Sequence, residues 1–259
     1  MNFFKWFVQL FKRRKGLGLV RSIPDKRDYK HKLSGSTINN IDLSSKTGRV
    51  LNQGRSNACT SFAVCEMLDF MLQYKKKRNW DGFVSSKLFL WYMSRLEEGS
   101  EKYNSGVILR NTFKILQTYG FTREQDYPFN NDWYSAPGTN VVVSASIWRP
   151  YIGTLPKYYS LNTSNNNFNK HVSNCLSNKS LIVFGFPIRS ELSTANSTDY
   201  EINTSTGTLK GYHAMLITGE TDTHYIIKNS WGSKWGLKGY CHIKKELMKE
   251  HGFDFWTLK

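Results

Sequence analysis

The 259-residue sequence lacks a long apolar stretch, and no segment approaches the roughly 18 apolar residues that a membrane-spanning helix needs. It has only four cysteines, with no close pair typical of a zinc or redox site and no dense disulfide framework of the kind that holds small secreted domains together. A reducing compartment is therefore favoured. Hydrophobic residues make up 39% of the chain and aromatic residues 15%, which excludes a disordered protein and favours a globular one.

Acidic residues are scarce, because 20 Asp and Glu stand against 36 Lys and Arg, a formal net charge of +16. Half of this excess lies in the first 32 residues, where ten basic residues meet only two acidic ones, Asp25 and Asp28, a net of +8. The basic residues do not form a recognisable nucleic-acid-reading motif, so nucleic acid is not expected as a partner.

Residues 1–22 are predicted to form a basic amphipathic arm. Its apolar residues recur at helical spacing: Phe3, Phe7, Leu10 and Phe11. Such a helix could pack on the body of the protein or on a neighbouring molecule, or residues 1–15 could bind an acidic partner or an anionic membrane surface. The arm lacks a basic leader and a small-residue cleavage site, so we do not expect a secretory signal peptide.

Three short motifs bring together groups that suit nucleophilic catalysis. They are Gln53-Gly54-Arg55-Ser56-Asn57-Ala58-Cys59-Thr60, Tyr212-His213-Ala214 and Lys228-Asn229-Ser230-Trp231-Gly232. Cysteine attacks as its thiolate, so Cys59 needs a base, which His213 can supply while Asn229 orients the ring. Attack on a carbonyl creates an oxyanion, which the Gln53 side chain and the Cys59 backbone N–H could stabilise. These four residues are the predicted catalytic set.

The order of these residues resembles that of the papain-like cysteine peptidases, over about residues 25–259. The compact branch of that family found in bacteria and viruses is similar along the chain as well. The shared stretches are Pro24-Asp25-Lys26-Arg27-Asp28-Tyr29, Ser86-Lys87-Leu88-Phe89-Leu90-Trp91-Tyr92, Tyr119-Gly120-Phe121, Tyr127-Pro128 and Asp254-Phe255-Trp256. The resemblance implies an endopeptidase that hydrolyses a polypeptide substrate through an acyl-thioester, with no metal or organic cofactor.

The fold implied by this resemblance is α+β and two-lobed, with a helical lobe, an antiparallel barrel-like lobe and the active site in the cleft between them. We expect the peptidase domain to span residues 23–259, with the helical lobe at about 45–135 and the β lobe at about 136–259.

The hydrophobic periodicity predicts helices first and strands later. Helices are expected over 58–74, with Cys59 in the first turn, over 87–98 after a Ser cap, and over 107–119 before Gly120. Strands are expected at five apolar runs: Val141-Val142-Val143, Leu181-Ile182-Val183-Phe184, Met215-Leu216-Ile217, Tyr225-Ile226-Ile227 and Gly239-Tyr240-Cys241-His242-Ile243.

Three more residues are predicted to bind substrate or support the site. By the resemblance, Gly106 offers its backbone to the substrate as a short strand partner, and the Trp231 indole covers the Asn–His hydrogen bond. Tyr212 precedes the histidine where many members carry Asp, and Thr60 follows the nucleophile where plant and animal members carry Trp. These two differences bear on subsite shape and pH profile.

Too few residues precede Gln53 for the long inhibitory propeptide of the secreted enzymes. Any latency must come from residues 1 to about 40, for example through Tyr29 in the cleft, and removal of residues 1–35 would then raise activity. A basic arm without a long propeptide would suit a viral enzyme packed with its target. We therefore expect an intracellular (cytoplasmic) or virion-associated location.

Each motif has a plainer explanation that stays open. Cys59 could be a buried structural thiol, His213 a core histidine and Asn229 a turn residue. Two other functions also remain: a catalytically silent papain-fold protein that binds or builds a virion, and an amidase or transferase that uses the same thioester. The remaining cysteines are expected to be core thiols: Cys65, Cys175 and Cys241.

Overall fold

The computed structural model describes residues 15–75, 82–130, 132–151, 157–161 and 167–259. The apolar stripe predicted in the N-terminal arm lies outside them, so its contacts with an acidic partner or an anionic membrane stay predictions. Within the described ranges, no helix combines the length and the apolar character needed to cross a membrane.

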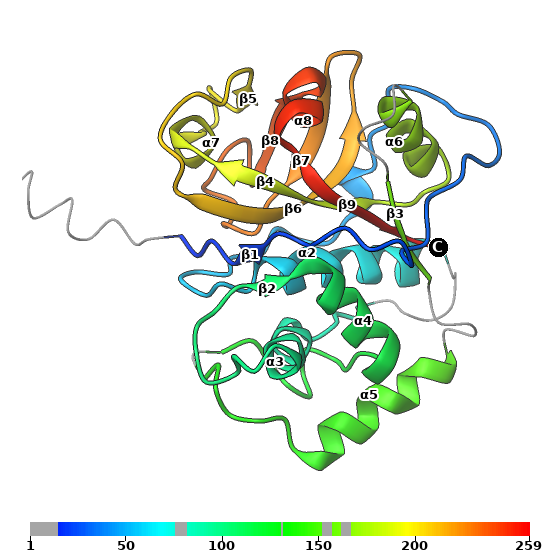
Figure 1. The fold of residues 1–259 in the computed structure, drawn as a ribbon, viewed down its shortest axis with the longest axis vertical. Coiled ribbons are helices and arrows are strands. Elements are labelled where there is room, and N and C mark those ends of the chain that lie inside the picture. Colours follow the sequence, from blue (N-terminus) through cyan, green and yellow to red (C-terminus); the bar gives the residue numbers. More distant parts are fainter. Residues whose placement is uncertain (1–14, 76–81, 131, 152–156, 162–166) are drawn as a thin grey trace, which may run out of the picture.

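Helix α2 (Cys59–Phe70) lies at the centre of the fold (Figure 1). All 12 of its residues are buried, which explains why apolar residues surround it instead of forming one stripe. It packs against the sheet on one side and against two further helices on the other. A short π-helix (Met71–Lys75) continues it, so the helix predicted over 58–74 is confirmed with a change of winding near its end.

Two further helices begin or end where the sequence predicts. Helix α3 (Lys87–Glu97) follows Ser86, whose Oγ accepts a hydrogen bond from Phe89 N at 3.0 Å and so caps the first turn. Helix α4 (Leu109–Tyr119) ends at Gly120, which adopts a φ of 85° that favours glycine.

The predicted start of the third helix at Val107 is wrong by two residues. Val107 and Ile108 form strand β2, which pairs in parallel with β1 (Leu19–Val20). The helix therefore begins at Leu109, because pairing with a segment almost 90 residues earlier in the chain takes the two preceding residues.

The strand predicted at Val141-Val142-Val143 is also wrong, because these residues belong to helix α5 (Thr139–Tyr151). Val141 and Ala145, four residues apart, are buried, whereas Val143 and Ile147 are about half exposed, at 50% and 52%. A spacing of four matches one face of a helix, and α5 packs with this pattern beside α4.

A seven-stranded sheet forms the other half of the molecule, and it is antiparallel except where β5 meets β8. Four of the five predicted strands are confirmed with shifted ends, as β4, β6, β7 and β8. The strands in spatial order are β3 (Tyr158–Ser160), β9 (Phe253–Leu258), β4 (Ile182–Ile188), β6 (Gly211–Glu220), β7 (His224–Lys228), β8 (Tyr240–Lys244) and β5 (Glu201–Ile202).

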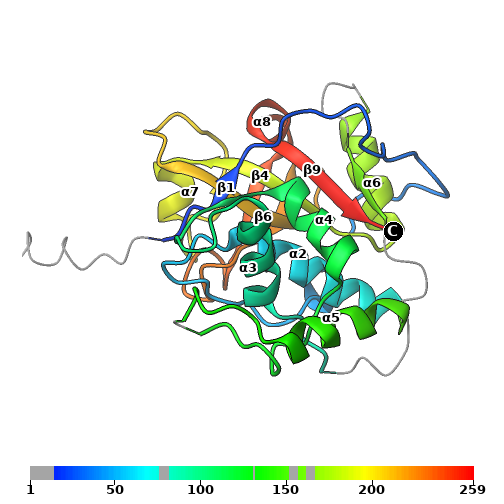
Figure 2. The same ribbon diagram turned by 60° about the horizontal axis from the view of Figure 1, so that its bottom comes forward.

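Figures 1 and 2 show α3, α4 and α5 on one side of α2 and the sheet on the other. One hydrophobic core joins α2 to both sides. The remaining short helices border or connect the strands: α6 (Phe168–Ser177), α7 (Ser190–Thr194), α8 (Lys245–His251) and a 3-10 turn (Ser44–Lys46).

Residues 15–31 run along the boundary between the sheet and the helices (Figure 1). Ser22 N donates to Asp254 Oδ2 (2.7 Å), and Asp28 forms an ion pair with Arg110 of α4 (2.6 Å). Farther on, the buried His31 meets the Cys175 thiol of α6 (3.3 Å). The segment thus contacts the helices and the sheet before the chain reaches α2.

Candidate active site

Cys59, the predicted nucleophile, is the first residue of α2 and is fully buried. Burial raises the pKa of its thiol to about 11, while backbone amides, first those of Ala214 and Gly18, act in the opposite direction. The N-terminal end of the helix dipole also favours a thiolate. Because Ala214 directly follows His213 in β6, its contact with the thiol brings Cys59 next to the predicted base.

His213 lies on β6 and is fully buried. Its Nε2 lies 2.8 Å from Asn229 Oδ1, and its Nδ1 has no hydrogen-bond partner among the described residues. Trp231 lies against the ring, with centroids 4.6 Å apart and planes inclined by 30°. The structure therefore brings His213, Asn229 and Trp231 together, and the role of the indole as a cover for the Asn–His hydrogen bond stays a prediction.

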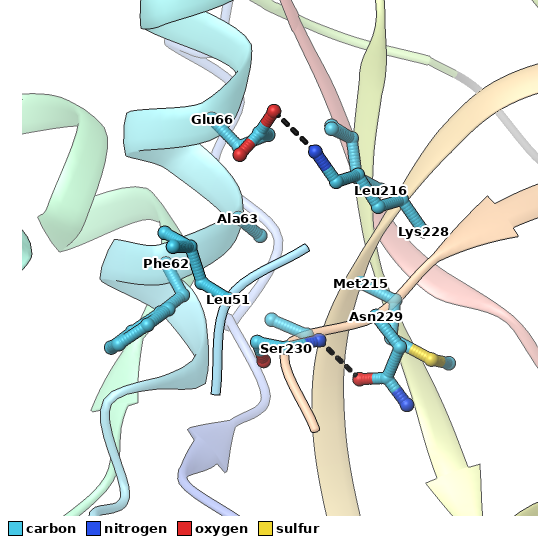
Figure 3. A pocket seen from close by; sticks show the side chains of 10 residues that line it. Leu51, Phe62, Ala63, Glu66, Met215, Leu216, Lys228, Asn229 and Ser230 are labelled. Atoms are coloured by element: carbon cyan, nitrogen blue, oxygen red, sulfur yellow. Dashed lines mark hydrogen bonds and ion pairs between the residues drawn. The ribbon is translucent and has the colours of Figure 1, made fainter. Parts of the chain in front are cut away.

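Gln53 lies at the junction of the nucleophile loop and the loop after β7. Its Nε2 donates to Ser56 O (2.7 Å) and to Gly16 O (3.3 Å), and its Oε1 accepts from Ser230 Oγ (2.5 Å). Ser230 therefore fixes which end of the Gln53 amide faces Gly16. Figure 3 shows Ser230 beside Asn229, whose Oδ1 also accepts from Ser230 N (2.7 Å).

Residues 15–20 lie against the loops that carry the predicted catalytic residues. Gly16 N donates to Gly54 O (3.3 Å), Leu17 N donates to Asn57 Oδ1 (3.0 Å), and Gly18 O accepts from Val107 N (3.0 Å). A Cβ added at Gly16 would lie 1.7 Å from Ser56 O, and one at Gly18 would lie 1.7 Å from Asn57 O. The two glycines let the backbone approach the site this closely.

The three predicted substrate-binding residues all lie along this segment. A Cβ at Gly106 would lie 2.3 Å from Gly18 O, so the two backbones pass closely there. The Trp231 ring lies under Lys15 Nζ, 4.4 Å away, and the Tyr212 ring lies 5.8 Å from the Arg21 guanidinium. Residues 15–21 therefore pass beside all three residues that were predicted to bind substrate.

The expectation that Tyr29 fills the site is wrong. Tyr29 is 57% exposed, and its ring centroid lies 6.0 Å from that of Tyr159, while its backbone O accepts a hydrogen bond from Ser160 N (2.8 Å). Tyr29 continues the segment along the sheet edge, and the residues at the site come earlier in the chain.

Lys15 also places a positive charge near the site, in addition to the close backbone contacts of Gly16 and Gly18. Its Nζ donates to Ser193 O (3.0 Å), and burial, with the nearby charge of Lys210, lowers its pKa to about 8. Burial lowers the pKa of His213 to about 4, opposed by the Asn229 hydrogen bond and assisted by the Lys15 charge.

Three further residues that contact the site are absent from the set predicted from the sequence: Ser230, Asn57 and Asn104. Asn57 N donates to Asn104 Oδ1, and each asparagine lies two residues before a predicted site residue, Cys59 or Gly106. That matched spacing was the available signal. Among the described residues, no three His, Cys, Asp or Glu side chains gather in a way that could hold a metal ion.

The family model for papain family cysteine proteases matches residues 38–254. The chain belongs to the papain family. It is therefore a cysteine-type peptidase, a hydrolase whose substrates are polypeptides. A peptidase C1-like protein of Acanthamoeba polyphaga mimivirus, L477, is 25% identical over 95% of this chain and 87% of its own length. A cathepsin L-like proteinase of Fasciola hepatica is 22% identical over 87% of this chain and 61% of its own.

Solved structures confirm the predicted α+β papain-like fold. Xylellain, a cysteine protease from Xylella fastidiosa, superposes with a TM-score of 0.82 at 26% identity, covering 96% of this chain and 98% of that one. Bromelain from Ananas comosus, in complex with the E64 inhibitor, gives a TM-score of 0.64 at 19% identity over 86% and 99% of the two chains.

Proposed function

We propose that this papain-family protein is an endopeptidase whose catalytic residues are Cys59, His213, Asn229 and Gln53. The observation that carries the proposal is the His213 ring. It is buried, its Nε2 meets Asn229, and its Nδ1 has no partner among the described residues although the next residue contacts the Cys59 thiol. A buried polar atom without a hydrogen-bond partner destabilises the folded protein. A role of Nδ1 in proton transfer would explain why this atom is left unpaired.

In the proposed reaction, His213 Nδ1 accepts the Cys59 proton and the thiolate attacks the carbonyl carbon of the scissile bond. Gln53 Nε2 and the Cys59 backbone N–H stabilise the negative charge that forms on the carbonyl oxygen. The C–N bond then breaks, and the leaving amine takes the proton from Nδ1. Water, deprotonated by His213, hydrolyses the thioester and restores the thiol.

Contacts within the site support these roles. Gly16 O, a peptide carbonyl, already accepts from Gln53 Nε2, the donor assigned to the oxyanion. Asn229 Oδ1 holds the His213 ring in the orientation that leaves Nδ1 free, and the Trp231 ring shields that hydrogen bond from water.

We also infer that the full chain is latent, because residues 15–20 occupy the place of the substrate. Strand β1 runs parallel to β2, and Cys59 and His213 beneath the segment are fully buried. Residues 22–31 contact the helices and the sheet and should be kept. Removal of residues 1–20 should therefore uncover the site without the loss of these contacts.

Labelling with the epoxide inhibitor E-64, read by intact mass and peptide mapping, tests the proposal. We expect one adduct on Cys59, none in Cys59→Ala, and faster labelling once residues 1–20 are removed. Digestion of an unfolded protein such as casein then separates an endopeptidase from an amidase or transferase.

Two results would count against the proposal. A folded chain without residues 1–20 that takes up no epoxide would favour the catalytically silent protein. A labelled chain that leaves casein and peptides intact would favour the amidase or transferase. Equal labelling of the full and shortened chains would reject latency alone.

A further inference from the structure

Two loops that carry site residues are joined by a pair of asparagines, Asn57 and Asn104. Asn57 N donates to Asn104 Oδ1 (2.8 Å), and Asn57 Nδ2 donates to Asn104 O (2.7 Å). Asn104 Nδ2 donates in turn to Arg55 O (3.1 Å). Each side chain therefore binds the main chain of the other loop.

The loop that contains Asn104 is held on its other side by α3. Arg95 Nη1 donates to Tyr103 O (2.8 Å), and Trp91 Nε1 donates to Ser105 O (3.2 Å). These bonds fix the loop to the helices, whereas the bonds of Asn104 fix it to the nucleophile loop. All four cysteines of the chain are free thiols, so no disulfide shares this task.

The remaining side-chain polar atom of Asn57, Oδ1, faces the segment that covers the site. Asn57 Oδ1 accepts a hydrogen bond from Leu17 N at 3.0 Å. Because Nδ2 is already bound to Asn104 O, the amide cannot turn without losing that bond, and its oxygen stays directed at the occupant. A main-chain N–H is present in nearly every residue, so this contact does not depend on the occupant's side chains.

We propose that Asn57 and Asn104 form an amide clamp, in which Asn104 sets the spacing of the two loops and Asn57 Oδ1 binds a main-chain N–H of the substrate. The ligand is an extended polypeptide backbone. The proposal rests on the proposed function, because it places substrate where residues 15–20 lie. Asn57 is then a substrate-binding residue, and Asn104 is a positioning residue that acts through it.

The test compares two reagents that carry the same chloromethyl ketone on Cys59 of the full chain. Acetyl-Leu-Gly chloromethyl ketone presents a peptide, with Leu and Gly chosen because Leu19 and Gly18 lie at the site, whereas chloroacetone presents none. Both must pass residues 15–20 to reach the thiol. The ratio of their second-order rates therefore removes changes in opening and reports peptide recognition.

We expect the ratio to be well above one in the wild type and to fall at least about tenfold in Asn57→Ala, as loss of a fixed acceptor and of the clamp implies. Asn104→Ala should lower it too. Asn104→Asp keeps the acceptor for Asn57 N but loses the donor to Arg55 O, so it should recover only part of the ratio. Asn203→Ala is the matched control, because that exposed side chain contacts His224 away from the site.

An unchanged ratio in Asn57→Ala, in protein with the wild-type unfolding midpoint, would overturn the clamp and leave the proposed function standing. A wild-type ratio near one would overturn both. If Asn57→Ala does not fold, Asn57→Ser replaces it, since serine is too short to reach either partner, and the same two outcomes decide.

Discussion

At the scale of single residues, the two groups that would exchange a proton are held neutral. Burial raises the pKa of Cys59 to about 11 and lowers that of His213 to about 4. Between these values the thiol keeps its proton and the imidazole stays uncharged, so a thiolate–imidazolium pair is disfavoured. Two effects therefore keep the covered site inactive: residues 15–20 block access to the thiol, and burial disfavours its thiolate form.

This state predicts the pH dependence of Cys59 alkylation in the full chain. The thiol is protonated below its pKa, so a pKa of about 11 means that the thiolate fraction rises about tenfold for each pH unit up to that value. We expect the rate of iodoacetamide addition at Cys59, followed by peptide mapping, to keep rising beyond pH 10. The same chain in urea should level off nearer the ordinary thiol pKa of about 8.5. A plateau near pH 8 in the folded chain would contradict the prediction.

The residues of the site could be predicted from sequence because their chemistry is carried by rare side chains at fixed motif positions. Cys59, His213 and Asn229 fall into this class, and the structure places them together. Ser230 and Asn57 act only through hydrogen bonds to neighbouring residues, and serine and asparagine are common in this chain. The spacing of Asn57 before Cys59 was a weak signal, and Ser230 offered none of its own.

At the scale of elements, the covering segment fits because two of its residues lack a side chain. Gly16 and Gly18 bring the backbone so close to Ser56 O and Asn57 O that a Cβ at either position would lie 1.7 Å from an oxygen. The β1–β2 pairing and the Leu17 hydrogen bond then hold the segment in place. Its hold on the site is therefore sensitive to a single methyl group.

We expect Gly18→Ala to uncover the site. An overpacked contact costs about 1–3 kcal/mol, which corresponds to a roughly 5- to 150-fold larger uncovered population. Chloroacetone labelling of Cys59 at pH 8 should rise by a factor in that range. The control is Gly138→Ala, whose Cβ would meet only the end of the Asn140 side chain, 2.7 Å away. Equal labelling of the two variants would contradict the prediction.

Elements that depend on local chemistry were predictable, and those that depend on distant partners were not. The Ser86 cap and Gly120 locate ends of α3 and α4 correctly. In contrast, β2 exists because Val107 pairs with Leu19, and no local pattern reports that pairing. The Val141-Val142-Val143 run has strand propensity, but its neighbours place it on a helix packed beside α4.

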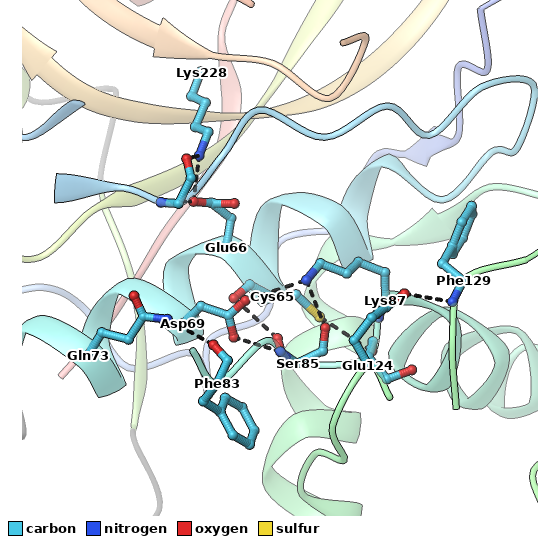
Figure 4. A network of polar contacts seen from close by, with 12 residues as sticks. Cys65, Glu66, Asp69, Gln73, Phe83, Ser85, Lys87, Glu124, Phe129 and Lys228 are labelled. Carbon is cyan, nitrogen blue, oxygen red and sulfur yellow. Dashed lines mark hydrogen bonds and ion pairs between the residues drawn. The ribbon is translucent and has the colours of Figure 1, made fainter. Parts of the chain in front are cut away.

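At the scale of the whole molecule, the sheet and the helices are tied together next to the site by a buried ion pair. Lys228 of β7 lies 2.6 Å from Glu66 of α2 (Figure 3). Glu66 also accepts a hydrogen bond from Gly48 N (2.9 Å). A second buried pair, Lys87–Asp69 (3.4 Å), continues this network between α2 and α3 (Figure 4). Because Lys228 directly precedes Asn229, its position also constrains that of the Asn229 side chain.

Removal of one partner of this pair should destabilise the protein more than removal of both charges. Lys228→Met leaves the Glu66 carboxylate buried without its cation, which typically costs about 3–5 kcal/mol. In Lys228→Met/Glu66→Gln no charge remains, and the glutamine oxygen can still accept from Gly48 N. Urea unfolding followed by tryptophan fluorescence should therefore rank the wild type first, the double variant second and the single variant last. If the double variant were no more stable than Lys228→Met, the unpaired Glu66 charge would not be the cause of the lost stability, and the prediction would be wrong.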